Sequence, residues 1–135
     1  MKTITNMMFI AIALISQSTA AQVCAKRVIV PEYPPIAWAA RWTGTADLII
    51  TVGPEGKVVD VVGKGARSVL IDHAQENVRT WTFCSPEDKG SGRVHLRFQY
   101  RLLGAPVYPR PTAKVLIDLG AGVIVITSRP GEPQP

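Results

Sequence analysis

Apolar and polar side chains alternate along two stretches of the chain, and this alternation predicts strands. In residues 93–102 the even-numbered side chains are apolar and the odd-numbered ones are polar or cationic. Residues 45–52 alternate in a similar way, with the more apolar face at the even-numbered positions. Because successive side chains of a strand point to opposite faces of a sheet, each stretch is typical of a strand with one buried face.

A hairpin is predicted at the first of these strands. A second β-branched run at 57–62 follows residues 45–52 after Gly53-Pro54-Glu55-Gly56, which is a turn signal. Gly63-Lys64-Gly65 comes directly after this run. Because glycine pairs often interrupt regular structure, we expect the second strand to break there.

Two helices are predicted from the spacing of apolar residues. They recur at helical intervals from Val69 to Trp81, which indicates an amphipathic helix with its polar side in solvent. A shorter helix is expected over 36–42, because Pro35 suits a first helical turn and Gly44 suits an exit. An extended segment over 26–30 precedes it.

The order of these elements defines the fold class. Strand, strand, helix and strand are followed by an extra C-terminal β-hairpin, in which 114–119 and 123–127 flank Gly120-Ala121-Gly122. A right-handed crossover through the helix places the strands at 57–62 and 93–102 parallel on either side of 45–52. The sequence therefore predicts an α+β fold of two layers, an antiparallel or mixed three-stranded sheet with one packed helix. Much of the core is expected from Leu48, Ile50, Leu70, Ala74, Val78, Trp81, Leu96 and Phe98.

Length and composition allow one modest domain. The chain has 135 residues, of which 47% are hydrophobic and 19% are charged, and this excludes wholesale disorder and a polytopic membrane protein. Lys2, the apolar stretch Met7–Ile15 and the small residues before Gln22 form the succession typical of a cleaved secretory signal. An uncleaved anchor is the alternative, but this stretch spans roughly 14 Å, about half of a hydrocarbon core. We expect a signal peptide at 1–21, the main domain at 22–104, a linker and hairpin at 105–128 and a disordered tail at 129–135.

The cysteine count fits an exported protein. Cys24 and Cys84 are the two cysteines of the chain. In an oxidising compartment a pair of cysteines predicts one intramolecular disulfide. A redox-active pair usually shows C-x-x-C spacing, which these residues lack, so we interpret the pair as structural.

Several short segments, taken in order, resemble the C-terminal domain of the TonB energy transducer family over roughly residues 31–102. These segments are Tyr33-Pro34-Pro35-Ile36-Ala37, Gly44-Thr45, Pro54-Glu55-Gly56-Lys57-Val58, Leu70-Ile71-Asp72-His73-Ala74, Val78-Arg79 and Trp81-Thr82-Phe83. The resemblance implies a non-enzymatic periplasmic domain without a cofactor. In the family, this domain binds a short extended motif of outer-membrane transporters and passes on work from a proton-driven inner-membrane complex, so that iron chelates or vitamin B12 enter.

The resemblance also implies how a partner binds. Family domains offer the edge of their sheet to an extended segment, a mode known as strand addition. The corresponding edge strand here is 93–102, with candidate partner-binding residues Arg93, His95, Arg97, Gln99 and Arg101. The expected partner is a TonB-dependent receptor-like or other envelope protein, and homodimerisation stays open. Three departures from the family are expected. The signal peptide replaces the usual membrane anchor and proline-rich spacer, and the turn has Glu55 where the family often has Asp. The C-terminal hairpin would block binding if it covered the edge strand.

A second hypothesis starts from charge. The formal net charge is +5, and Arg93, Arg97 and Arg101 share one strand face, with Lys26 and Arg27 elsewhere. Such a row suits anionic envelope components such as peptidoglycan or lipid head groups, whereas export argues against nucleic acid. The competing interpretation is that charge on an outer face serves solubility.

Candidate catalytic or metal-binding residues are few. His73 lies beside Asp72 and three residues before Glu76, which allows an acid/base pair, but this spacing is common on exposed helices. His95 is expected to be solvated. The two histidines and two cysteines lack zinc-ligand spacing, and Gly63-Lys64-Gly65 lacks the remaining residues of a phosphate loop. We therefore predict neither an enzyme nor a metal site.

Overall fold

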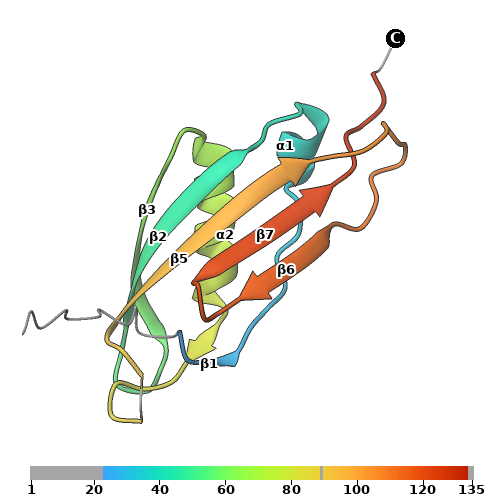
Figure 1. Ribbon diagram of the computed structural model, residues 1–135. Helices are drawn as coiled ribbons and strands as arrows, with labels where there is room; N and C mark the ends of the chain where they lie inside the picture. The colour runs from blue at the N-terminus through green and yellow to red at the C-terminus, as the bar shows by residue number, and fades with distance from the viewer. Residues whose placement is uncertain (1–22, 89, 134–135) are drawn as a thin grey trace, which may run out of the picture.

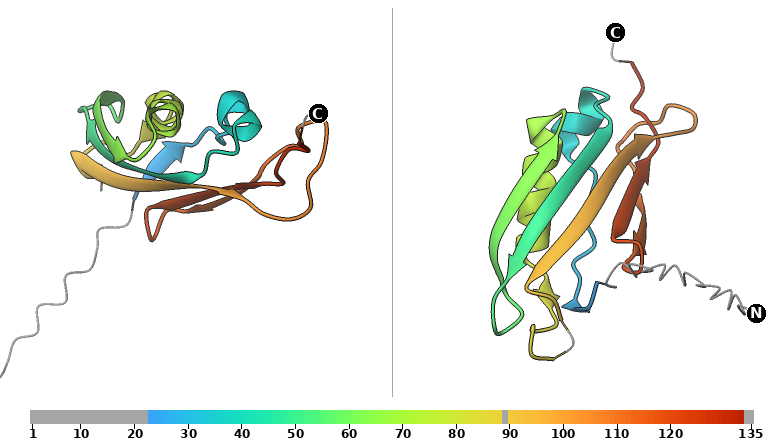
Figure 2. Two further views of the ribbon diagram at one scale, coloured as in Figure 1. Left: turned by 90° about the horizontal axis from the view of Figure 1, so that it is seen from above. Right: turned by 60° about the vertical axis from the view of Figure 1, so that its left-hand side comes forward.

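One mixed sheet forms the centre of the computed structural model, which describes residues 23–88 and 90–133. The predicted signal peptide at 1–21 lies outside the described residues. The sheet has five strands in the order β3-β2-β5-β7-β6, and both helices lie on the same face of it (Figures 1 and 2). These elements are β2 (Gly44–Val52), β3 (Val58–Gly65), β5 (Arg93–Leu102), β6 (Lys114–Asp118), β7 (Val123–Ser128), α1 (Pro35–Ala39) and α2 (Ser68–Arg79).

The predicted α+β class and strand order are confirmed. β2 pairs antiparallel with β3 on one side and with β5 on the other, so β3 and β5 run parallel to each other. This is the arrangement that a right-handed crossover through α2 produces. α2 packs on β2 and β3 and ends at Arg79, two residues before the predicted end, and α1 also ends earlier than predicted.

The predicted core is confirmed, because all eight residues named from the sequence are buried. The even-numbered side chains of β2 and β5 face the helices, and those of α2 at Leu70, Ala74 and Val78 meet them. Trp81 follows α2, and its indole N–H donates to the Ile29 carbonyl at 3.1 Å. The regular alternation in the sequence therefore located the buried face correctly.

The predicted strand break at Gly63 and Gly65 is wrong, because β3 runs through both glycines. A Cβ atom at Gly63 would come within 2.5 Å of the Ile71 side chain of α2, and one at Gly65 within 2.4 Å of the Thr45 carbonyl oxygen. Glycine in a strand often marks such a close approach. The two glycines therefore allow α2 and β2 to approach β3 closely.

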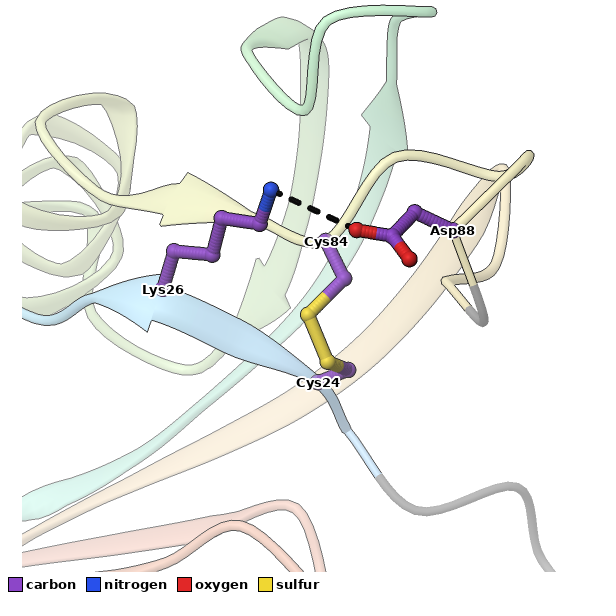
Figure 3. The surroundings of a disulfide bond; sticks show 4 residues. All are labelled: Cys24, Lys26, Cys84 and Asp88. Atoms are coloured by element: carbon purple, nitrogen blue, oxygen red, sulfur yellow. Dashed lines mark ion pairs between the residues drawn. A yellow bond between two sulfur atoms is a disulfide. The ribbon is translucent and has the colours of Figure 1, made fainter.

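A small second sheet joins the N-terminal segment to the region after α2. β1 (Ala25–Arg27) pairs antiparallel with β4 (Thr82–Phe83), which the sequence did not predict. The predicted disulfide between Cys24 and Cys84 is confirmed beside this pairing, with the two Cα atoms 5.4 Å apart (Figure 3). Lys26 and Asp88 form an exposed ion pair at 3.6 Å across the same junction (Figure 3).

The C-terminal hairpin is part of the main sheet rather than an addition outside a three-stranded sheet. β7 pairs parallel with β5 over 97–102, and β6 pairs antiparallel with β7. Ile124 and Ile126 of β7 are fully buried on the helix side of the sheet. The expected three-stranded sheet is thus extended to five strands.

The prediction of a disordered tail at 129–135 is wrong for residues 129–133, which the structure describes. The indole N–H of Trp38 donates to the Arg129 carbonyl at 2.8 Å, and the Arg41 guanidinium donates to the Gly131 carbonyl at 2.6 Å. Gly131 also lies against the Trp38 ring, where a Cβ atom would come within 2.9 Å. The tail is held because Trp38 of α1 and Arg41, in the turn after α1, donate to its carbonyl groups.

Candidate protein-interaction site

β5, the strand predicted as the binding edge, is an interior strand, and the prediction is wrong on this point. β2 pairs with it over residues 93–100 and β7 pairs with it over 97–102. The Arg97 N–H donates to the Gly122 carbonyl at 2.8 Å, so the odd-numbered residues of β5 direct their main-chain groups toward β7. The hairpin of this chain occupies the positions that an added strand would need.

The start of β5 extends past β7 but offers little free main chain. The Ser91 hydroxyl is 2.7 Å from the Arg93 carbonyl oxygen and 3.2 Å from its amide nitrogen, so it occupies both outward groups of that residue. Within the described residues, the outward N–H and C=O of His95 have no hydrogen bond. His95 is among the residues that line a hollow of about 320 Å³ between the disulfide and the turn at 120–122. One free residue is too short for strand addition.

Both helices lie on one face of the sheet and leave the other uncovered (Figure 2). The alternating burial along β5 places the five predicted binding side chains on the uncovered face. Two of the three arginines already have partners within the sheet: the Arg97 Nε donates to Asp47 at 2.8 Å, and Arg101 donates to the Gln99 side chain at 2.8 Å. The Asp47 carboxylate neutralises the charge of Arg97 locally. The cationic row is therefore weaker than the sequence implied.

β3 is one of two free edges of the main sheet, and it carries features that discourage pairing. The register shifts between Thr51 and Val52, so that Val59 is an extra residue in β3, and its side chain is 60% exposed. The exposed side chains of Asp60 and Lys64 lie farther along the strand. Bulges and charged side chains are common protections of sheet edges.

β6 is the other free edge, and its centre lacks such protection. Val123, Val125 and Thr127 of β7 direct their main-chain groups toward β6, opposite Asp118, Leu116 and Lys114. The main-chain groups of Val115 and Ile117 therefore point away from the sheet. No hydrogen bond within the described residues reaches them.

The side chains of β6 also distinguish it from β3. Leu116, at the centre of the strand, is 65% exposed on the uncovered sheet face, and Lys114 and Asp118 lie exposed at the two ends. Val115 and Ile117 are half-buried on the other face. An edge with unpaired main-chain groups and an exposed leucine is a suitable template for another strand.

The residues considered for acid/base chemistry are not assembled into a site. The His73 side chain is half-buried, and its Nδ1 lies 3.0 Å from the Tyr100 hydroxyl. Burial lowers the pKa of His73 below 6.5, and the carboxylates of Glu76 and Glu32 only partly offset this effect. Asp72 and Glu76 are exposed, and no hydrogen bond joins either to His73 in the part of the chain that the structure describes. His73 therefore packs at the edge of the hydrophobic core.

Two further features bear on the kind of site. Across residues 23–88 and 90–133, no cluster of histidine, cysteine, aspartate or glutamate side chains is placed to hold a metal ion. Neither described helix is long and apolar enough to cross a membrane.

Sequence reasoning placed the site on β5 and missed β6. The signal that indicates β6 is the order Lys114-Val115-Leu116-Ile117-Asp118, an apolar centre between two charges. The run of β-branched residues in β7, Val123-Ile124-Val125-Ile126, is typical of a buried strand, but on its own it does not decide between a separate hairpin and pairing beside β5.

The comparisons with known proteins give one match. The family described as Gram-negative bacterial TonB protein C-terminal matches residues 30–102, which is more than half of the chain and includes β2, β3, α2 and β5. No curated protein and no solved structure matches. The matched range ends at the last residue of β5, so β6 and β7 lie outside it.

Proposed function

The chain belongs to the Gram-negative bacterial TonB protein C-terminal family, a family of non-enzymatic interaction domains of the envelope, and on this premise we propose that it is a periplasmic module that binds an extended segment of an envelope protein by strand addition at β6. The partner that we propose is an outer-membrane transporter of the TonB-dependent kind or another envelope protein. A contribution to transport is part of this proposal and follows from the family.

The choice of β6 depends on what the C-terminal hairpin does to β5. In the family mode, the third strand of the domain receives the partner, but here β7 is already paired with that strand. Ile124 and Ile126 anchor β7 in the core, so the hairpin is not a detachable cover. The free edge of the sheet has moved outward by two strands, to β6.

The observation that carries the proposal is the unpaired main chain at Val115 and Ile117. Each residue offers one donor and one acceptor to an added strand, and a net contribution of about 0.5–1.5 kcal/mol is typical of each hydrogen bond. The exposed Leu116 side chain would pack on an apolar residue of the added segment. Main-chain pairing therefore supplies affinity, and the side chain opposite Leu116 supplies selectivity.

A proline substitution tests the main-chain pairing. Val115→Pro removes the outward N–H without removing a hydrogen bond to β7, because prolines are tolerated at edge positions whose N–H faces solvent. Val115→Ala, the matched control, shortens the side chain and keeps the N–H. In pull-downs from envelope extract, we expect the bait to capture the same protein in wild-type and Val115→Ala form and to lose it in Val115→Pro form. Equal capture by the two variants would refute strand addition at β6.

The cationic face remains the second candidate function, favoured by the exposed side chains of Arg93, Arg97 and Arg101 on an uncovered sheet face. Binding to anionic envelope material through this row would weaken strongly as salt is added, because exposed charges are screened beyond about 10 Å at 0.1 M salt. Strand pairing would persist. A capture that disappears at high salt and after replacing the three arginines by glutamine would favour the cationic role.

A further inference from the structure

We propose that β6 also joins two copies of this chain, paired antiparallel about a two-fold axis at Leu116, so that self-association and partner binding compete for one edge. This inference rests on the proposed function, which assigns strand addition to the same edge. Its basis is the order of residues in β6 together with the direction of its main-chain groups.

The charges of β6 are complementary when the strand pairs with a second, antiparallel copy of itself. When two copies of Lys114–Asp118 run antiparallel with Leu116 opposite Leu116, each Lys114 lies opposite an Asp118 of the other copy. Both charged side chains are exposed on the uncovered face of the sheet. Directly opposite residues of antiparallel strands interact, and opposite charges favour the pairing. A parallel arrangement would place like charges opposite each other.

The main chain fits the same register. The groups of Val115 and Ile117 point outward, and in this register Val115 of one copy faces Ile117 of the other. Such a pair exchanges two hydrogen bonds in an antiparallel ladder. Leu116 then lies at the non-hydrogen-bonded position between the two pairs, where opposite side chains are closest. Charge, hydrogen bonding and apolar contact thus select one register.

The side chains gain burial on both faces. On the uncovered face, each exposed Leu116 would cover the other beside Val125 of β7, which is its neighbour in the sheet. On the helix face, the half-buried Val115 and Ile117 would meet their counterparts. The two sheets would become one continuous sheet across the axis. Because so short a contact buries little area, we expect a dissociation constant in roughly the micromolar to millimolar range.

A second copy on β6 excludes the partner's segment, because both use the main chain of Val115 and Ile117. High local concentration would therefore store the protein as dimers, and a partner that binds more tightly would release monomers. Partner affinity measured at increasing protein concentration should fall as the dimer forms.

Charge inversion provides the main test. Lys114→Glu places two acidic pairs across the axis, and Asp118→Lys places two basic pairs there, so each variant alone should stay monomeric at concentrations where the wild type dimerises in sedimentation velocity. Mixed in equal amounts, the two variants should form a heterodimer, because every pair across the axis is then opposite in charge. A wild type that is monomeric at all concentrations, or variants that dimerise as well as the wild type, would overturn the proposal.

Cross-linking provides a second measurement that does not depend on the charges. Leu116→Cys should form a disulfide with itself in the dimer, since opposite positions across the axis lie within the 4.4–6.8 Å Cα separation that a disulfide needs. Lys114→Cys should not link to itself, but it should link to Asp118→Cys when the two are mixed. Because Asp118 also accepts a hydrogen bond from the Ala121 amide at 3.0 Å, circular dichroism must show that its variants fold. Self-linking of Lys114→Cys would contradict the register.

The experiments can refute partner binding at β6 and self-pairing at β6 independently of each other. Lys114→Glu should abolish the dimer and leave capture of the envelope partner intact, because it keeps every main-chain group of β6. Val115→Pro should abolish both. Loss of the dimer in Val115→Pro with unchanged partner capture would refute the proposed function alone, whereas a monomeric wild type with normal capture would refute the self-pairing alone.

Discussion

Replacing Ile124 of β7 by alanine tests whether the C-terminal hairpin is a structural part of the sheet or a displaceable cover of β5. Ile124 is fully buried and packs on the helix side of the sheet, two residues from the equally buried Ile126. Large-to-small substitutions of this kind cost about 2–5 kcal/mol in the free energy of unfolding. Leu116→Ala on β6, where the side chain is largely exposed, is the matched control, and we expect a change within about 0.5 kcal/mol.

The same residues set the cost of opening β5 to a partner. Lifting the hairpin would expose both isoleucines, at about 1.5–3 kcal/mol each, before any lost hydrogen bonds are counted. A total of about 3–6 kcal/mol corresponds to an open population of roughly 1 in 100 to 1 in 10,000. Binding at β5 would be weakened by that factor. The structure therefore predicts that partners do not use β5.

Urea unfolding of Ile124→Ala and Leu116→Ala measures the loss in the free energy of unfolding. Amide hydrogen exchange measures how readily the hairpin lifts from β5. The Gln99 amide faces β7 and the Phe98 amide faces β2. A detachable hairpin would therefore let the Gln99 amide exchange quickly, while the Phe98 amide stayed protected by β2. We expect similar protection at both. A cost below about 1 kcal/mol for Ile124→Ala, or fast exchange confined to Gln99, would refute the reasoning and restore β5 as a binding edge.

Three other predictions concern the rest of the fold. Replacing Cys24 and Cys84 together by serine should lower the free energy of unfolding by about 4 kcal/mol on the chain-entropy treatment, because the disulfide closes a loop with a sequence separation of 60. Equal urea midpoints for the double variant and the oxidised wild type would contradict this. Gly56→Ala should destabilise the protein by at least about 1–2 kcal/mol, because Gly56 has a φ of 82° and its added Cβ would lie 2.0 Å from a main-chain oxygen of β4. Thermal melts measure this loss, and Gly92→Ala, whose Cβ would meet nothing within 4 Å, is the control. The free energy of unfolding should fall as the pH drops below about 6.5, because burial depresses the pKa of His73 in the folded state and the unfolded chain binds the proton more readily. His73→Gln should flatten that part of the profile of urea midpoint against pH. An unchanged slope would show that other groups cause it.

The elements that could be predicted from the sequence are those whose pattern is local. The alternation in residues 93–102 located β5 with the bounds that the structure shows, because each apolar side chain of that strand lies on the buried face. The periodicity of Leu70, Ala74 and Val78 located the buried face of α2 for the same reason. Local turn residues likewise predicted the hairpin of β2 and β3.

The candidate site could not be predicted in the same way, because it depends on which strands are neighbours. The pattern of residues 123–127 is equally compatible with a separate hairpin and with pairing beside β5, and only the second places the free edge at β6. The glycines at 63 and 65 were ambiguous between a strand break and a close helix approach, and the nearness of Ile71 decides the matter. The tail was ordered by Trp38, which lies 91 residues from its acceptor Arg129.

The link between Cys24 and Cys84 also determines how the molecule would respond to tension. A pull applied on the N-terminal side of Cys24 and resisted at the C-terminus would pass through the covalent bond directly to the segment before β5. The strands and helices between the two cysteines would be shielded from that load. Extension would have to begin with the C-terminal strands, so resistance to mechanical unfolding in the oxidised protein would depend on shearing β7 along β5.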